Sequence, residues 1–185
     1  IAWREDHKLL KVSFPVQITA DEALHEIQFG YVKRSTHKSR QYDADRFEVC
    51  AHKWTALAET SRGCAVLNDC KYGVSTAGGR INLTLLKAPL VPDMHADRGL
   101  QEFTYAFYAW NGSFAESGLT QAAYELNSPV MTAQGAAAAG ERSLFSLDHS
   151  AVVLSAVKLA EDQSGDIILR LYESTKTTAS CLLNT

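Results

Sequence analysis

The sequence predicts an all-β protein, an antiparallel β-sandwich of the super-sandwich type with little helix. Apolar residues recur mainly at every second position, which is the spacing of a strand with one buried face. Turn residues separate the candidate strands, and no long amphipathic helix lies between them. With 185 residues, 46% of them hydrophobic, the chain is sized for one globular domain or two small ones.

The first predicted strand covers residues 10–18, where apolar side chains alternate with polar or small ones. Pro15 has no amide hydrogen, which indicates an edge strand or a bulge. Further strands are predicted at residues 25–33, 46–52, 64–67, 80–86, 102–109, 151–159 and 166–173. Residues 160–166 are polar and contain Gly165, so they predict a short hairpin loop between the last two strands.

The alternation also predicts the core. The side chains expected to be mainly buried are Leu10, Val12, Phe14, Ile27, Phe29, Phe47, Val49, Ile81, Leu83, Leu85, Phe103, Tyr105, Leu169 and Leu171. If they all face inward, the strands that carry them form two sheets that pack face to face.

Two segments decide how the chain divides. Residues 119–126 stay open between helix and strand, because Ala and Glu favour a helix while Ala122, Tyr124 and Leu126 also alternate. Residues 134–140, with consecutive alanines between glycines, predict a flexible connection. We therefore expect a main β-sandwich region at 1–140. Residues 141–185 are expected to form C-terminal β-hairpin strands of the same or an adjoining sandwich, truncated at the end.

Charge and hydropathy disfavour two classes of partner. The chain has 18 Lys and Arg against 21 Asp and Glu, with both signs interspersed, so no broad basic surface is expected for nucleic acid. The apolar runs are far shorter than the roughly 18 to 20 residues that span a bilayer, so we expect a soluble protein with no membrane segment. The chain begins at Ile1 without a signal-peptide pattern, which suggests a piece of a longer protein.

Sulfur and imidazole donors raise the question of a metal. We expect the four cysteines to be free thiols in a reducing compartment. Cys50, His52, Cys64 and Cys70 could supply zinc ligands, but thirteen residues separate the first two cysteines and five separate the next pair. Structural zinc sites usually space such pairs by two to four residues. The prediction is therefore that this chain holds no metal.

The sequence offers no catalytic machinery. It contains no Gly-x-Ser-x-Gly elbow or other local nucleophile pattern. Acidic pairs such as Asp43 with Asp45 are expected to be solvated loop charges, because closeness in sequence does not set the carboxylate separation of roughly 5 to 10 Å that glycoside hydrolysis needs. The basic run at residues 33–40 is likewise expected to be a solvated loop.

Residues 67–73, hereafter the 67–73 loop, form the most informative segment. The loop places Asn68, Asp69, Lys71 and Tyr72 together and ends at a glycine. Amide and carboxylate groups bind vicinal hydroxyls, and a tyrosine face can cover a sugar ring. The alternative is a turn in which Asn and Asp bond their own backbone. The residues alone leave both interpretations open.

At these residues the sequence resembles glycoside hydrolase family 38, the α-mannosidases, in the subgroup of the cytosolic and vacuolar enzymes. The resemblance is to their C-terminal β region and covers nearly the whole chain. The matching blocks are HKLLKVSFP at 7–15, EIQFG at 26–30, RSTH at 34–37, RFEVCAHKW at 46–54, LNDCKYG at 67–73, LLKAP at 85–89, ADRG at 96–99, EFTYA at 102–106, QAAYELN at 121–127 and LRLYE at 169–173. Departures occur at Lys87, Gln101 and Trp110, where relatives tend to have Arg or His.

The resemblance implies an enzyme that hydrolyses terminal α-linked mannose with retention, using an aspartate nucleophile and a zinc ion. Both belong to an N-terminal catalytic domain of the same polypeptide, so this chain is expected to be inactive alone and to carry no zinc ligand. The resemblance also implies that the 67–73 loop approaches the sugar pocket, which makes Asn68, Asp69, Lys71 and Tyr72 candidate substrate-binding residues. A cytoplasmic location is expected, with the vacuole possible, and the chain could form homo-oligomers.

Two other hypotheses stay open at this point. One is a free-standing carbohydrate-binding β-sandwich module, which would recognise mannose without a catalytic domain. The other is a purely structural interface domain whose residues 68–72 only support their own turn.

Overall fold

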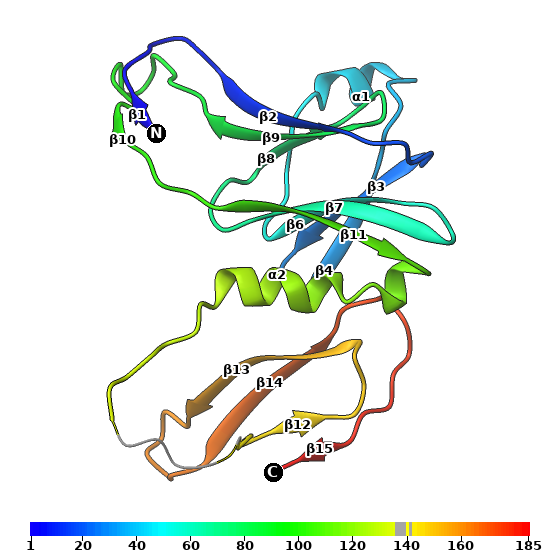
Figure 1. The fold of residues 1–185 in the computed structure, drawn as a ribbon, viewed down its shortest axis with the longest axis vertical. Helices are drawn as coiled ribbons and strands as arrows, with labels where there is room; N and C mark the ends of the chain where they lie inside the picture. Colours follow the sequence, from blue (N-terminus) through cyan, green and yellow to red (C-terminus); the bar gives the residue numbers. More distant parts are fainter. Residues whose placement is uncertain (136–139, 141) are drawn as a thin grey trace.

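The computed structural model describes residues 1–135, 140 and 142–185 and confirms the predicted all-β, sandwich-like class (Figure 1). The strands of the first part are β1 Ala2–Trp3, β2 Leu10–Pro15, β3 Glu22–Ile27, β4 Gly30–Ser35, β5 Val49–Cys50, β6 Trp54–Ala58, β7 Arg62–Asn68, β8 Gly73–Thr76, β9 Arg80–Leu86, β10 Gly99–Leu100 and β11 Tyr105–Asn111. The helices are α1 Gln41–Asp45, the 3-10 turn η1 Phe114–Glu116 and α2 Leu119–Asn127. The last strands are β12 Ser146–Leu147, β13 Val152–Leu159, β14 Ile167–Glu173 and β15 Leu183–Asn184.

Two antiparallel sheets form the sandwich. One has the strand order β11-β7-β6-β3-β4 and the other β2-β9-β8-β5. Every second residue of the facing strands is buried between the two sheets. These residues include Leu57, Cys64 and Val66 from the first sheet and Ile81 and Leu83 from the second. Pro15 lies in β2, an edge strand, as predicted, so its missing amide hydrogen breaks no ladder inside the sheet.

The five-stranded sheet is covered on both faces. Its remaining residues, such as Ala56, Ala65 and Leu67, face α2 and η1 and pack with Leu119 and Ala123 of α2. Because successive side chains of a strand point to opposite faces, β7 is buried along almost its entire length. Figure 1 shows the resulting order of layers, with α2 lying across the far face of the five-stranded sheet.

The segment that the sequence left undecided is the helix α2. It begins after Gly118, which has a φ of 65°, a conformation that suits glycine. Leu119 and Ala123 lie four residues apart, and both are buried on the sheet side. A strand would have placed Ala122, Tyr124 and Leu126 on one face, but burial follows the helical spacing instead.

The C-terminal part lies beyond α2 in Figure 1. Strands β13 and β14 form the predicted hairpin, closed by a hydrogen bond from the Ala160 amide to the Asp166 carbonyl at 2.8 Å. The Tyr172 hydroxyl donates to the Tyr124 hydroxyl of α2 at 3.1 Å, and the Tyr172 ring packs edge to face with Phe29. The expected connection at 134–140 falls largely on residues outside those described, and the division at residue 140 stays a prediction.

The predicted strand at 25–33 is wrong in one respect. It consists of two strands, β3 and β4, joined by a tight turn at Gln28 and Phe29. Phe29 has a φ of 59° in this turn and is 59% exposed, so it is not part of the core. The turn reverses the chain, and a side chain at its tip has no opposing sheet to face.

Three other expected core residues are also exposed. The predicted strand at 46–52 shortens to Val49–Cys50, and Phe47, in the connection between α1 and β5, is exposed. Tyr105 and Leu171 lie in β11 and β14 as expected, but on faces that the described residues leave partly open.

Within the described residues, no helix is long and apolar enough to cross a membrane.

Candidate functional site

The 67–73 loop joins the end of β7 to the start of β8, and Asn68 sets its shape. Asn68 is 2% exposed. Its Nδ2 donates to the His52 carbonyl at 2.7 Å, while its Oδ1 accepts the Lys71 amide at 2.7 Å. Both ends of the side-chain amide are thus used by backbone groups, and the turn from 68 to 71 is closed around them.

Asp69 ties the loop to the segment that leads into β11. Its amide donates to the Thr104 carbonyl at 3.2 Å, and its Oδ2 accepts the Thr104 amide at 2.9 Å. Burial alone would raise the pKa of Asp69, but the Cys70 thiol and the hydrogen bonds from Thr104 outweigh it and hold the pKa below its usual value. Asp69 is therefore an ionised tether at the edge of the five-stranded sheet.

Of the other two candidate residues, Lys71 is half-buried and Tyr72 is exposed. The Lys71 ammonium lies 5.0 Å from the centre of the Phe103 ring. Tyr72 is 49% exposed, and its ring packs edge to face with His52 at 5.3 Å between centroids. The backbone of Tyr72 is fixed, because its carbonyl accepts the Ala51 amide at 2.9 Å. The structure thus brings all four predicted residues into one turn, with Asn68 buried, Asp69 and Lys71 half-buried and Tyr72 exposed.

A buried carboxylate beside this loop was not singled out from the sequence. Glu26 of β3 is 4% exposed and accepts the Lys53 amide at 2.9 Å and the Lys53 ammonium at 3.1 Å. The His52 Nδ1 lies 3.9 Å from the same carboxylate. The sequence signal for this group is that Glu26 follows Leu24 by two positions in one strand. This spacing puts both side chains on the face of the sheet that packs toward α2. This group holds the base of the loop, since His52 contacts both Glu26 and Tyr72.

The cysteines and His52 do not gather into a metal centre. Cys64 is buried between the sheets, whereas Cys50 and Cys70 are exposed. Burial raises the pKa of the Cys64 thiol, as expected of a thiol that packs as a small apolar group. Among the residues that the structure describes, no three His, Cys, Asp or Glu side chains come together in a way that could hold a metal ion.

Comparison with protein families identifies two segments of the chain. The model for the "Glycosyl hydrolases family 38 C-terminal domain" matches residues 1–95. The model for the "Glycosyl hydrolases family 38 C-terminal beta sandwich domain" matches residues 151–185. The first match ends before β10 and β11, and the second contains β13, β14 and β15.

Individual relatives extend the match over the whole chain. Human alpha-mannosidase 2C1 is 46% identical over 188 aligned residues, which cover 100% of this chain and 18% of the relative. Alpha-mannosidase G of Dictyostelium discoideum is 40% identical, with 94% of this chain and 16% of the relative covered. The chain therefore spans less than a fifth of the length of these relatives.

Solved structures support the fold. An alpha-mannosidase from Enterococcus faecalis V583 superposes with a TM-score of 0.82 at 19% identity, covering 95% of this chain and 21% of that one. A second family 38 protein from Enterococcus faecalis gives a TM-score of 0.77 at 18% identity over 95% of this chain and 22% of that one. Taken with the family models and the full-length sequence match, this likeness shows that the chain belongs to glycosyl hydrolase family 38 and represents its C-terminal region.

Proposed function

We propose that this chain is the non-catalytic C-terminal β-sandwich portion of a zinc-dependent, retaining α-mannosidase. In this proposal it packs on the N-terminal catalytic domain of the same polypeptide and lends the 67–73 loop to the mannose pocket. The observation that carries the proposal is the 46% identity to human alpha-mannosidase 2C1 across the full length of the chain. The expected cytoplasmic location belongs to the same proposal.

The chemistry of hydrolysis is assigned to the rest of the polypeptide. In this proposal the zinc and its ligands belong to the N-terminal catalytic domain, as the resemblance to family 38 implies. No step of the reaction is therefore attributed to residues of this chain. Its contribution is to position a rigid loop at the edge of a site built by another domain.

The geometry of the loop supports this role. Asn68 and Asp69 use their side chains on backbone groups of residues 52, 71 and 104, which fixes the loop in one conformation. Lys71 and Tyr72 are then held on a rigid base, where an ammonium can donate to a sugar hydroxyl and a phenol ring can cover an apolar sugar face. We infer that these two residues contact the substrate and that Asn68 and Asp69 position them.

The test uses the full-length enzyme and an aryl α-mannoside. Tyr72→Ala and Lys71→Met should each lower kcat/KM about tenfold or more, because each removes a contact worth on the order of 1 to 3 kcal/mol. Phe107→Ala is a matched control, since Phe107 is an aromatic residue that is also 49% exposed but lies in β11, outside the loop. If both loop variants hydrolyse the mannoside as the wild type does, the loop does not border the pocket.

A second experiment separates this proposal from a free-standing carbohydrate-binding module. The isolated 185-residue chain should release no sugar from the aryl α-mannoside, with or without added zinc. It should also show no saturable binding of mannose by titration calorimetry, because the loop would be only one wall of the pocket. Tight mannose binding by the isolated chain would favour the binding-module hypothesis.

A further inference from the structure

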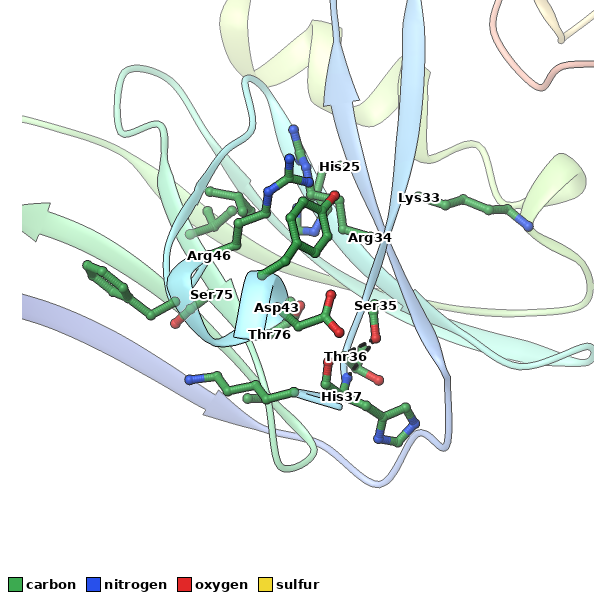
Figure 2. A pocket seen from close by; sticks show the side chains of 16 residues that line it. His25, Lys33, Arg34, Ser35, Thr36, His37, Asp43, Arg46, Ser75 and Thr76 are labelled. Carbon is green, nitrogen blue, oxygen red and sulfur yellow. Dashed lines mark hydrogen bonds between the residues drawn. The ribbon is translucent and has the colours of Figure 1, made fainter. Parts of the chain in front are cut away.

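A polar cavity lies away from the 67–73 loop, between β4 and β8 and beneath α1 (Figure 2). Its volume is about 320 Å³, which lies at the lower end of the range for small-molecule sites. Figure 2 shows Arg34 and Arg46 at one end of the cavity, close to His25. Ser75 and Thr76 of β8 line another wall.

The two arginines converge on this cavity without a carboxylate partner. The Arg34 Nη1 donates to the Cys50 carbonyl at 3.0 Å, and the Arg46 guanidinium lies 3.9 Å from the centre of the Tyr42 ring. These contacts fix both side chains but neutralise neither. Burial lowers the pKa of Arg34, and the positive charge of Arg46 adds to this effect, while Cys50 opposes it.

Two other basic side chains that line the cavity, Lys33 and His37, are paired, whereas Lys38 has no carboxylate oxygen within 4.0 Å among the described residues. Lys33 lies 3.6 Å from Glu22, and His37 lies 2.9 Å from Asp21. Asp43, the carboxylate that lines the cavity, accepts the Arg40 amide at the start of α1. Among the described residues, neither Arg34 nor Arg46 has a carboxylate oxygen within 4.0 Å. The cavity therefore holds an excess of positive charge at the end where the two guanidinium groups meet.

His25 adds a buried polar atom that has no partner. The side chain is 0% exposed, and its Nδ1 lies 3.2 Å from the Thr55 hydroxyl. Its Nε2 is buried without a hydrogen bond among the described residues. When the Thr55 hydroxyl donates to Nδ1, the ring proton lies on Nε2, which is then an unused donor in a side chain that lines the cavity but has no surface accessible to solvent. An unmade hydrogen bond of this kind is destabilising unless a ligand or water completes it.

We propose that this cavity binds the phosphate group of a small phosphomonoester, held by Arg34 and Arg46. Arginine forks match phosphate oxygens in geometry, and a dianion can be shared by two guanidinium groups. The hydroxyls of Ser75 and Thr76 supply further donors to the remaining part of the ligand. This inference is independent of the proposed role in mannoside hydrolysis, since no residue of the 67–73 loop takes part.

The test measures binding to the full-length protein by titration calorimetry, with inorganic phosphate and glucose 6-phosphate as probes. Both should bind saturably, with dissociation constants on the order of 1 mM or tighter. Saturating probe should raise the melting temperature, because a ligand that binds only the folded state stabilises it. Arg46→Gln and Arg34→Lys should each weaken binding at least tenfold. Arg170→Gln is the control, since Arg170 lies in β14 and does not line the cavity.

Several results would overturn the proposal. One is that neither inorganic phosphate nor glucose 6-phosphate binds saturably. Another is that Arg46→Gln and Arg170→Gln weaken phosphate binding equally. Citrate is the third probe, and binding of citrate without binding of phosphate would show that the cavity selects carboxylates instead. If Arg34→Lys fails to fold, Arg46→Gln decides the matter, because Arg46 is exposed and its replacement leaves the core intact.

Discussion

Trp110 of β11 lies directly opposite Gly63 of β7, and its indole ring occupies the space that a larger residue at 63 would need. A Cβ atom placed on Gly63 would lie 2.1 Å from Cζ2 of Trp110. Trp110 is buried and cannot swing into solvent without leaving the core it shares with Trp54 and Leu119. The glycine is therefore required by close packing across a strand pair.

Gly63→Ala should destabilise the protein by about 1 to 3 kcal/mol, the usual effect of overpacking a core. The free energy of unfolding, measured by denaturant titration, checks this. Trp110→Leu in the same chain should remove most of the added penalty, so the double variant should be more stable than the sum of the single effects predicts. Gly135→Ala is the control, because nothing lies within 4 Å of a Cβ at that position. Equal effects at 63 and 135 would contradict the packing argument.

His25 should make the stability depend on pH. Burial, with a smaller contribution from Arg34, lowers the pKa of His25 from 6.5 to about 3. The unfolded chain therefore takes up the proton first as the pH falls below 6.5, and stability declines between pH 6.5 and 3. At pH 4.5 the loss attributable to His25 should be about 2 to 3 kcal/mol.

The measurement compares denaturant titrations at pH 4.5 and 7.5 for the wild type and His25→Leu. The variant should lose less stability on acidification than the wild type does, because it has no proton to take up at this position. His37→Gln serves as the control, since His37 is exposed. A drop of the same size in all three proteins would mean that His25 is not the group that titrates.

The sequence predicted the fold class because strand spacing and turn residues are local signals. The hairpin of β13 and β14 follows from alternation on both sides of a polar loop, and β9 lies at the residues predicted for it. The helix α1 was missed because five residues are too short for a helical periodicity to appear. Phe29 was placed in the core because a hairpin turn inside an apolar run leaves the spacing pattern almost unchanged.

The two sites differ in how far the sequence could locate them. The 67–73 loop is contiguous, so its polar residues could be seen together before the structure was known. The polar cavity beneath α1 is lined by residues of β3, β4, α1 and β8. Its Arg34 belongs to a basic run that was expected to be solvated. A charged run becomes part of a cavity only through tertiary contacts, such as the hydrogen bond from Arg34 to the carbonyl of Cys50.

The contact between the hydroxyls of Tyr172 and Tyr124 should couple the C-terminal hairpin to α2. Burial and the hydrogen bond with Tyr124 raise the pKa of Tyr172, so the Tyr172 hydroxyl stays neutral at physiological pH. A double-mutant cycle with Tyr172→Phe and Tyr124→Phe should give a coupling free energy of about 0.5 to 1.5 kcal/mol. The control cycle pairs Tyr172→Phe with Tyr108→Phe, because the Tyr108 hydroxyl donates to the Ser117 carbonyl and not to Tyr172. Additive effects of the first pair would show that the hairpin is not tied through this bond.

Asn68 and Tyr72 should separate stability from function within one loop. Asn68→Ala removes a donor to the His52 carbonyl and an acceptor for the Lys71 amide, and both partners are left in a partly buried site. The expected loss is about 2 to 4 kcal/mol of unfolding free energy, since each unsatisfied group is worth on the order of 1 to 3 kcal/mol. Tyr72→Ala should lose less than about 1 kcal/mol, because half of that side chain is already in water.

The comparison is made on the full-length protein by following thermal unfolding and mannoside hydrolysis together. Asn68→Ala should lower the melting temperature and also reduce kcat/KM, because Lys71 is no longer held by its amide. Tyr72→Ala should reduce kcat/KM with little change in the melting temperature. Asn127→Ala is a related variant, since Asn127 donates to the backbone carbonyl of Asn68 at 3.1 Å and leaves the Asn68 side-chain amide in place. If Asn68→Ala left the melting temperature unchanged, the side-chain amide would not be what closes the turn, and its place among the substrate-binding candidates would have to be considered again.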